Sequence, residues 1–260
     1  MVLDEARNNY KNIMSKRGRL TMSLQDICKN ALNYKSRLST YARATLDEKI
    51  GNVSTFVPLT YIDIIRRNLW KSANLILDVG CGRGLPMKVM NRQKKFYSVG
   101  VDLFMPYLKE AKKERIHDEY VLCDVCCLPF REKSFDVALC LEVIDHLSKN
   151  DGRKLLKELE QVASAQIIMS AHVGFHPLVE GIDDNPLQVH KSGWMPKEFK
   201  SLGFKVRGQG FRYVYRSAAG AFISVPRKLL SYTISYLLVP CTYFTPDLAA
   251  HMVCVKTRNE

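Results

Sequence analysis

The sequence contains no apolar run of about 18 residues, the length that a helix needs to cross a lipid bilayer. Its first ten residues carry charges and lack an apolar stretch, so we expect no secretory signal peptide. Internal repeats are also missing. These absences predict a cytoplasmic globular protein, and 260 residues with 47% hydrophobic residues suffice for one large domain with appendages.

A second cysteine pair of metal-binding spacing is missing too. Cys123 and Cys126 have a spacing that suits zinc, but no matching pair follows them, so we assign no metal ion to the chain. Several of the eight cysteines lie in or beside apolar segments that predict buried strands, where cysteine behaves as a small hydrophobic residue. We therefore expect reduced core thiols rather than a disulfide scaffold.

Acidic residues are scarce relative to basic ones. The chain has 26 Asp and Glu against 39 Lys and Arg, which gives a formal net charge of +13. Such a charge favours encounter with an anionic partner, which could be a nucleic acid, a membrane surface or a phosphorylated substrate. Because the basic residues are spread in short groups along the chain, a solvated basic surface without a partner is an equally good interpretation.

Short apolar segments alternate with helical segments from residue 75 onward. Residues 1–70 are polar and basic and predict a helical extension, in which Thr60 would cap a helix at 61–70. The strands are expected at 75–77, 96–101, 120–123, 135–141, 166–170, 205–215 and 250–256, and the main helices at 86–93, 106–114 and 147–162. This alternation predicts an α/β domain with a mostly parallel sheet and helices on both faces. An apolar insertion at about 217–246 precedes the last strand.

The segment after the first predicted strand combines Asp78 with three glycines. Glycines permit a sharp turn and let a ligand lie against the bare backbone. Gly80, Gly82 and Gly84 are each two residues apart, which differs from the Gly-x-Gly-x-x-Gly pattern of dinucleotide sites. Asp78, at the entrance to this loop, suits a ligand with a cationic amino group.

Two more acidic residues follow the next two predicted strands. Asp102, about 20 positions after the loop, could accept hydrogen bonds from both hydroxyls of a ribose, and Asp124 is placed for an adenine amino group. Because the carboxyl ends of parallel strands meet at one edge of a sheet, Asp78, Asp102 and Asp124 should converge on one crevice.

Together these motifs resemble class I S-adenosylmethionine-dependent methyltransferases, most closely the subgroup of ubiquinone- and menaquinone-biosynthesis enzymes. The resemblance rests on residues 75–84, 102, 124–130 and 134–147, which occur in the family's order. It implies S-adenosylmethionine as cofactor and a Rossmann-like domain at 71–260 with seven strands, the last of them antiparallel. A dehydrogenase-type nucleotide domain is the alternative, and the glycine spacing argues against it.

The resemblance also implies which residues meet the cofactor. These are Asp78, Gly80, Cys81, Gly82, Asp102, Leu103, Asp124, Val125, Leu141 and Glu142. The loop residues would border the methionine part, Asp102 would hold the ribose with Leu103 against the adenine, and Asp124 with Val125 would read the adenine edge. Leu141 and Glu142 would close the sulfonium side.

Catalysis needs a base if the acceptor is a hydroxyl. His146 is the candidate, and a helix-capping or core histidine is the competing interpretation. On a helix, Glu142, Asp145 and His146 would share one face. This trio resembles the divalent-metal site of quinone-ring and small-RNA-end methyltransferases, but similar segments occur in relatives where no metal is implied.

The loops after the fifth predicted strand are expected to form the acceptor side. Residues 170–177 and 184–194 are polar with aromatic residues between, and loops of this kind often carry substrate contacts. Trp194 would contact the acceptor, pack beneath the helix that follows, or do both. The insertion at 217–246 could lie on a membrane interface, cover an apolar pocket or mediate dimerisation.

The predicted function is therefore O-methylation of a small-molecule, glycan or lipid-linked acceptor, with peripheral membrane contact. RNA methylation is the alternative that the net charge favours. Nucleic acid is the less favoured partner because an Asn-Pro-Pro-Tyr-like motif and an attached RNA-binding module are both missing. A non-catalytic protein that binds S-adenosylmethionine is the third interpretation, and the sequence predicts no oligomeric state.

Overall fold

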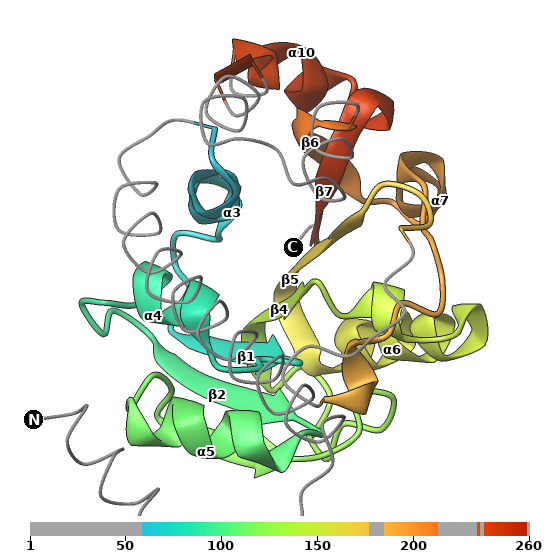
Figure 1. Ribbon diagram of the computed structural model, residues 1–260. Coiled ribbons are helices and arrows are strands. Elements are labelled where there is room, and N and C mark those ends of the chain that lie inside the picture. Colours follow the sequence, from blue (N-terminus) through green and yellow to red (C-terminus); the bar gives the residue numbers. More distant parts are fainter. Residues whose placement is uncertain (1–58, 177–184, 213–232, 235–236, 259–260) are drawn as a thin grey trace, which may run out of the picture. The chain divides into compact units, whose positions relative to one another are not determined.

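The computed structural model describes residues 59–176, 185–212, 233–234 and 237–258 (Figure 1). The chain divides into two compact units, Met1–Asp47 and Glu48–Glu260. All described residues belong to the second unit, so most of the helical extension predicted at 1–70 lies outside the described residues.

Seven strands of the described chain form one sheet in the order β3-β2-β1-β4-β5-β7-β6 (Figure 1). Their bounds are β1 Leu75–Val79, β2 Tyr97–Asp102, β3 Glu119–Leu122, β4 Phe135–Leu141, β5 Ala163–His172, β6 Lys205–Phe211 and β7 Ala249–Thr257. The first five strands pair in parallel, and β7 runs antiparallel to both β5 and β6. This arrangement confirms the predicted Rossmann-like sheet with an antiparallel last strand.

Helices cover both faces of the sheet, and each face has its own hydrophobic cluster. The α-helices are α3 Tyr61–Asn68, α4 Leu85–Met90, α5 Met105–Lys113, α6 Lys149–Val162, α7 Pro196–Ser201 and α10 Val239–Phe244. One cluster contains Ile65 of α3 and Met87 of α4, and the other contains Leu159 of α6 and Phe199 of α7. The sheet is therefore buried on both sides, as parallel strands require.

Helix α3 packs on the sheet although it lies before the predicted domain boundary at residue 71. The Tyr61 hydroxyl lies 2.6 Å from Ser170 Oγ on β5, and the Trp70 backbone N–H donates to Gln166 Oε1. Thr60 occupies the N-cap position, but its side chain makes no capping hydrogen bond, so that part of the prediction is wrong. The Asp63 carboxylate accepts a hydrogen bond from the Leu59 N–H instead, which satisfies a donor just before the helix.

Most of the apolar insertion predicted at 217–246 lies outside the described residues. Its described helix, α10, packs closely on β6, where a Cβ atom at Gly208 would lie 2.2 Å from the Thr242 carbonyl oxygen. Among the residues that the structure describes, no helix is long and apolar enough to cross a membrane. The seven described cysteines are free thiols, as expected.

Candidate cofactor and acceptor site

The loop after β1 has the backbone geometry that its glycines predict. Gly80, Gly82 and Gly84 have φ values of +70°, +54° and +74°, a region that side chains other than glycine rarely adopt. A Cβ atom at Gly80 would also lie 2.4 Å from Val143 Cγ2, whereas one at Gly82 would meet only Tyr107 Cδ2 at 3.8 Å. The loop is therefore tightly packed at Gly80, whereas a Cβ atom at Gly82 would make only an ordinary van der Waals contact.

Asp102, at the end of β2, is tied to this loop. Its Oδ2 accepts a hydrogen bond from the Gly82 N–H at 2.8 Å, and its Oδ1 accepts one from the Phe104 N–H at 2.8 Å. Burial raises the pKa of the Asp102 carboxyl, and these backbone N–H groups partly offset that effect. The Asp102 carboxylate is thus tied to the glycine loop.

Asp78, the fourth residue of β1, forms a buried pair that sequence reasoning missed. Its Oδ2 lies 3.4 Å from Nε2 of His117, and both side chains are almost fully buried. Burial, with Asp102 nearby, raises the pKa of Asp78 to about 7, and burial lowers the pKa of His117 to about 4. The only sequence signal was Gly100, where a Cβ atom would lie 2.5 Å from the His117 ring.

The predicted adenine side follows β2 and β3. Asp124 is exposed, and its Oδ1 accepts a hydrogen bond from the Cys126 N–H at 2.9 Å. Val125 is buried in one of the two hydrophobic clusters, while Leu103 is 47% exposed. Leu103 therefore presents an apolar surface next to Asp102, where the resemblance placed an adenine ring.

The predicted helical face of Glu142, Asp145 and His146 is wrong. Glu142 has a φ of +56°, and only Ile144–His146 form a helix, the single 3₁₀ turn η1. Glu142 Oε2 and Asp145 Oδ2 instead lie 3.2 Å and 3.1 Å from Nδ1 of His172. The ring of His146 points to another neighbour, with Nδ1 3.4 Å from the Val189 carbonyl oxygen.

Comparisons with known proteins found a family match over the segment that contains most of these residues. Residues 77–166 match the family model described as "Methyltransferase domain". This segment is a methyltransferase domain. It contains the glycine loop, Asp102, Asp124 and Glu142, and its class uses S-adenosylmethionine as cofactor. The contacts of individual residues with that cofactor stay predictions.

Two curated relatives carry tRNA methyltransferase names. The chain is 34% identical over 93 residues to "Probable tRNA methyltransferase 9B" of Homo sapiens and 33% identical over 92 residues to "tRNA (carboxymethyluridine(34)-5-O)-methyltransferase" of Arabidopsis thaliana. Each match covers 35% of this chain, and 19% and 22% of the respective relatives, so the similarity spans about a fifth of their length. The quinone-biosynthesis subgroup stays a prediction.

One solved structure extends the likeness of fold over most of the chain. It is the putative methyltransferase in a complex with the Trm112 methyltransferase activator of Haloferax volcanii. The match has a TM-score of 0.54 and covers 78% of this chain and 89% of that chain at 13% identity. At 13% identity the likeness shows a shared fold and nothing more, and that fold is the class I methyltransferase fold.

Histidines line the predicted acceptor side of the methyltransferase domain. The ring centroid of His172 lies 5.0 Å from that of His190 and 4.3 Å from that of His251, and His146 lies 4.7 Å from His190. Sequence reasoning placed His172 and His190 in this wall but missed His251, which belongs to β7. The signal that could have found it is the pairing of the last strand with β5.

These histidines set the charge of Glu142. Burial raises the pKa of this carboxyl, but charge and hydrogen bonding from His251, with the charge of His172, outweigh burial and hold the pKa at about 2. Burial lowers the pKa of His146, and neighbouring His190 lowers it further. Glu142 is therefore ionised at neutral pH, while His146 is neutral and able to accept a proton.

Trp194 packs beneath a helix, which confirms one of the two predicted roles. It is 2% exposed, its Nε1 donates to Ser192 Oγ at 3.0 Å, and its ring contacts Phe199 of α7. Lys149 Nζ lies 3.6 Å from the centroid of the Trp194 ring. The loop that is predicted to form the acceptor side is thus held by a buried indole.

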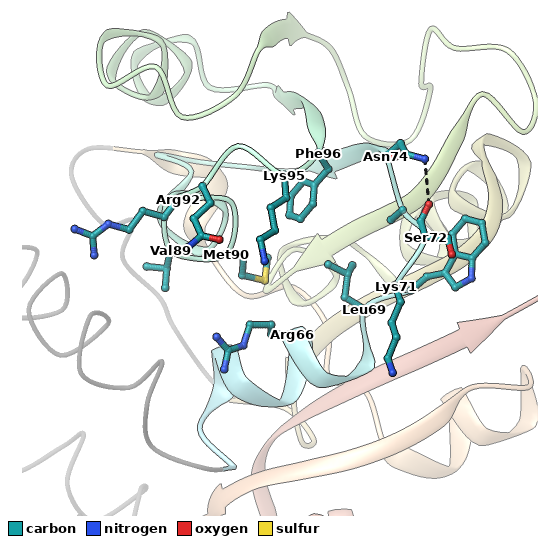
Figure 2. A pocket seen from close by; sticks show the side chains of 13 residues that line it. Arg66, Leu69, Lys71, Ser72, Asn74, Val89, Met90, Arg92, Lys95 and Phe96 are labelled. Atoms are coloured by element: carbon teal, nitrogen blue, oxygen red, sulfur yellow. Dashed lines mark hydrogen bonds between the residues drawn. The ribbon is translucent and has the colours of Figure 1, made fainter.

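A large cavity of about 1090 Å³ lies at the opposite edge of the sheet, next to the starts of β1 and β2. Figure 2 shows its side chains coming from α3, from the segment before β1, from the end of α4 and from the segment between α4 and β2. Among the described residues that line it, four are basic and none is acidic: Arg66, Lys71, Arg92 and Lys95. None of the predicted cofactor residues lines this cavity.

Proposed function

We propose that this chain transfers the methyl group of S-adenosylmethionine to an oxygen atom of RNA. The observation that carries the proposal is the identity of 33–34%, over about a third of the chain, to proteins named tRNA methyltransferases. One of these names specifies carboxymethyluridine and a 5-O position, which favours oxygen as the acceptor atom. The net charge of +13 is consistent with a polyanionic substrate.

RNA therefore takes precedence over the small-molecule or lipid-linked acceptor that the sequence alone favoured. One of the two arguments against RNA was the missing Asn-Pro-Pro-Tyr-like motif, and that motif concerns nitrogen acceptors rather than oxygen. The basic cavity beside α3 adds four cationic side chains, and the part of its lining that the structure describes contains no acidic residue. Such a surface can bind phosphates of the RNA backbone. The nucleotide to be methylated would then enter the predicted cofactor and acceptor site at the opposite edge of the sheet.

The residues of the loop fit the cofactor on three observations. A Cβ atom at Gly82 would make only an ordinary van der Waals contact, with Tyr107, Asp102 is fixed by two backbone N–H groups, and Asp78 is a buried acid whose neighbour in the described chain is the neutral His117. A cationic amino group of the ligand would provide the positive charge that neutral His117 does not give to the ionised Asp78 carboxylate. When bound, S-adenosylmethionine supplies a methyl group on a positively charged sulfur.

The chain's own contribution to the reaction is positioning and proton removal. Methyl transfer is an in-line displacement, so holding donor and acceptor in line lowers the barrier. With its proton on Nδ1, His146 donates to the Val189 carbonyl oxygen and keeps the Nε2 lone pair for a proton from the acceptor. A carboxylate acceptor carries no proton, and His146 would then only help to position it.

The test is transfer of radiolabel from [methyl-³H]S-adenosylmethionine by the purified full chain. We expect label in a tRNA-rich RNA fraction, and none with Asp102→Ala, which removes a predicted cofactor contact. Label that becomes volatile after mild alkali indicates a methyl ester, and stable label indicates an ether. His146→Ala should lower turnover by roughly 10²–10⁴-fold for a hydroxyl acceptor and far less for a carboxylate. Label in a metabolite extract but not in RNA would refute the RNA acceptor.

A further inference from the structure

Five of the chain's six histidines gather at the carboxyl ends of β4 and β5 and on neighbouring β7. Ring contacts link them in one group, in which the His172 ring lies within 5.3 Å of three others, measured between centroids. The five are His146, His172, His176, His190 and His251. Two carboxylates, those of Glu142 and Asp145, contact the same group. Methyl transfer as proposed uses at most one of these imidazoles as a base.

Three of these side chains come from adjacent strands. His172 is the last residue of β5 and pairs directly with His251 on β7. Glu142 immediately follows β4, and its backbone N–H donates to the Ser170 carbonyl oxygen of β5. The sheet itself therefore fixes the spacing of the three residues, without help from a long loop.

The distances between their polar atoms suit a shared metal ion. Glu142 Oε2 lies 3.2 Å from His172 Nδ1 and 3.5 Å from His251 Nδ1. One ligand atom from each residue can be chosen so that all three lie within 4.8 Å of one another. Ligands at metal bonds of about 2.1 Å in tetrahedral geometry are roughly 3.4 Å apart, which lies between these two separations.

We propose that Glu142, His172 and His251 bind a divalent first-row transition-metal ion such as Zn²⁺ or Co²⁺. Two imidazoles and one carboxylate suit ions of this class, whereas Mg²⁺ prefers oxygen ligands throughout. This set differs from the trio of Glu142, Asp145 and His146, which the structure separates. The two carboxylate oxygens of Glu142 are shielded from solvent and face histidine nitrogens, although the three side chains are 20–32% exposed, so an ion could reach the site.

A second set in the same cluster is Asp145, His172 and His190. It is the weaker candidate because Asp145 Oδ2 already accepts a hydrogen bond from the His172 backbone N–H at 2.9 Å. That bond orients the strand end that carries the His172 ring. Asp145 is therefore a positioning residue, and the two sets compete for the same imidazole of His172.

An ion at this place would lie at the sulfonium side of the predicted cofactor site, beside Glu142. There it could bind an anionic oxygen or lower the pKa of a hydroxyl, a role that rests on the proposed function. Metal binding itself does not rest on it, since binding can be measured without cofactor or acceptor. A failure of either proposal leaves the other to be judged separately.

The experiment titrates the chelator-treated full chain with Zn²⁺ by calorimetry and with Co²⁺ by visible absorption. We expect one equivalent of each ion, with cobalt d–d bands of a four- or five-coordinate site. His251→Ala should weaken binding by about 10–100-fold or more, and Glu142→Gln should act in the same direction while keeping the shape of the side chain. His251→Asn replaces the alanine variant if circular dichroism shows that alanine unfolds the chain.

The matched control is His190→Ala, which removes an imidazole of the same cluster from the competing set. We expect its affinity to stay within about threefold of the wild type. The proposal is overturned if the wild type binds neither ion at micromolar concentration, if His251→Ala binds as well as wild type, or if His190→Ala is the variant that loses binding. A cobalt–thiolate charge-transfer band would also overturn it, since that band would place the ion at a cysteine, and the proposed site contains none.

Discussion

At the scale of single residues, the pKa of Asp78 predicts how the affinity for the cofactor depends on pH. Its pKa of about 7 reflects burial and the nearby Asp102, while His117 beside it is neutral above pH 6 because its own pKa is about 4. A cationic amino group binds the ionised carboxylate. Affinity should therefore rise with pH as Asp78 loses its proton, by roughly tenfold between pH 6 and pH 8.

This pH dependence is measured as the dissociation constant of S-adenosylhomocysteine, by calorimetry from pH 5.5 to pH 8.5. Asp78→Asn should bind the ligand more weakly and with little change across that range, because the amide does not titrate. If the variant retains the pH slope of the wild type, another group is responsible and Asp78 does not meet the amino group.

The sequence predicted where some candidate site residues lie and missed the position of others, for reasons that lie in the backbone. Asp78 and Asp102 were predictable, because each lies at the end of a parallel strand and such ends meet at one edge. The left-handed conformation of Glu142 was not, since a non-glycine residue gives no sign of a positive φ. A helical spacing was therefore assumed for Glu142, Asp145 and His146, and the assumption failed.

At the scale of the elements, helix α3 belongs to the packed domain although the predicted domain boundary at residue 71 excluded it. Ile65 of α3 is fully buried in the same cluster as Met87 of α4. Ile65→Ala should lower the free energy of unfolding by about 2–5 kcal/mol, since it opens a cavity in a close-packed core. Chemical denaturation of the full chain, followed by circular dichroism, measures the change.

The neighbouring Arg66 provides the control for that measurement. Its side chain is 53% exposed and pairs with Asp63 at 3.7 Å, so Arg66→Ala should change the unfolding free energy by no more than about 1 kcal/mol. Equal effects of the two substitutions would mean that α3 does not pack on the sheet in solution.

The strands were the most predictable elements, because buried parallel strands are short apolar runs between turns. Residues 135–141 coincide with β4, whereas β5 runs from Ala163 to His172 and is longer than the predicted 166–170. The added residues at its carboxyl end include His172, the centre of the histidine cluster. Polar residues that extend a strand past its apolar run do not fit the apolar pattern of a buried strand, so the sequence does not predict them as strand residues. Such residues, like His172, are the ones that form the candidate site.

At the scale of the whole molecule, the charge of +13 and the basic cavity bear on how RNA would bind. If the cavity holds phosphates, replacing Arg92 and Lys95 by glutamine should weaken RNA binding at low salt. It should also reduce the slope of log affinity against log salt concentration by about 1 for each phosphate that the variant no longer binds. Fluorescence anisotropy with labelled tRNA between about 50 and 200 mM salt gives both quantities.

The matched control removes the same charge elsewhere. Lys112 and Lys113 are exposed near the end of α5 and do not line the cavity, so their replacement by glutamine should leave the slope nearly unchanged. Equal weakening by both double variants would mean that the RNA responds to the net charge alone, because a diffuse field does not distinguish one basic pair from another. A larger effect at Arg92 and Lys95 would instead place the bound phosphates at the start of β1 and β2. The bound RNA would then have to span the sheet from that edge to the edge that carries Gly82.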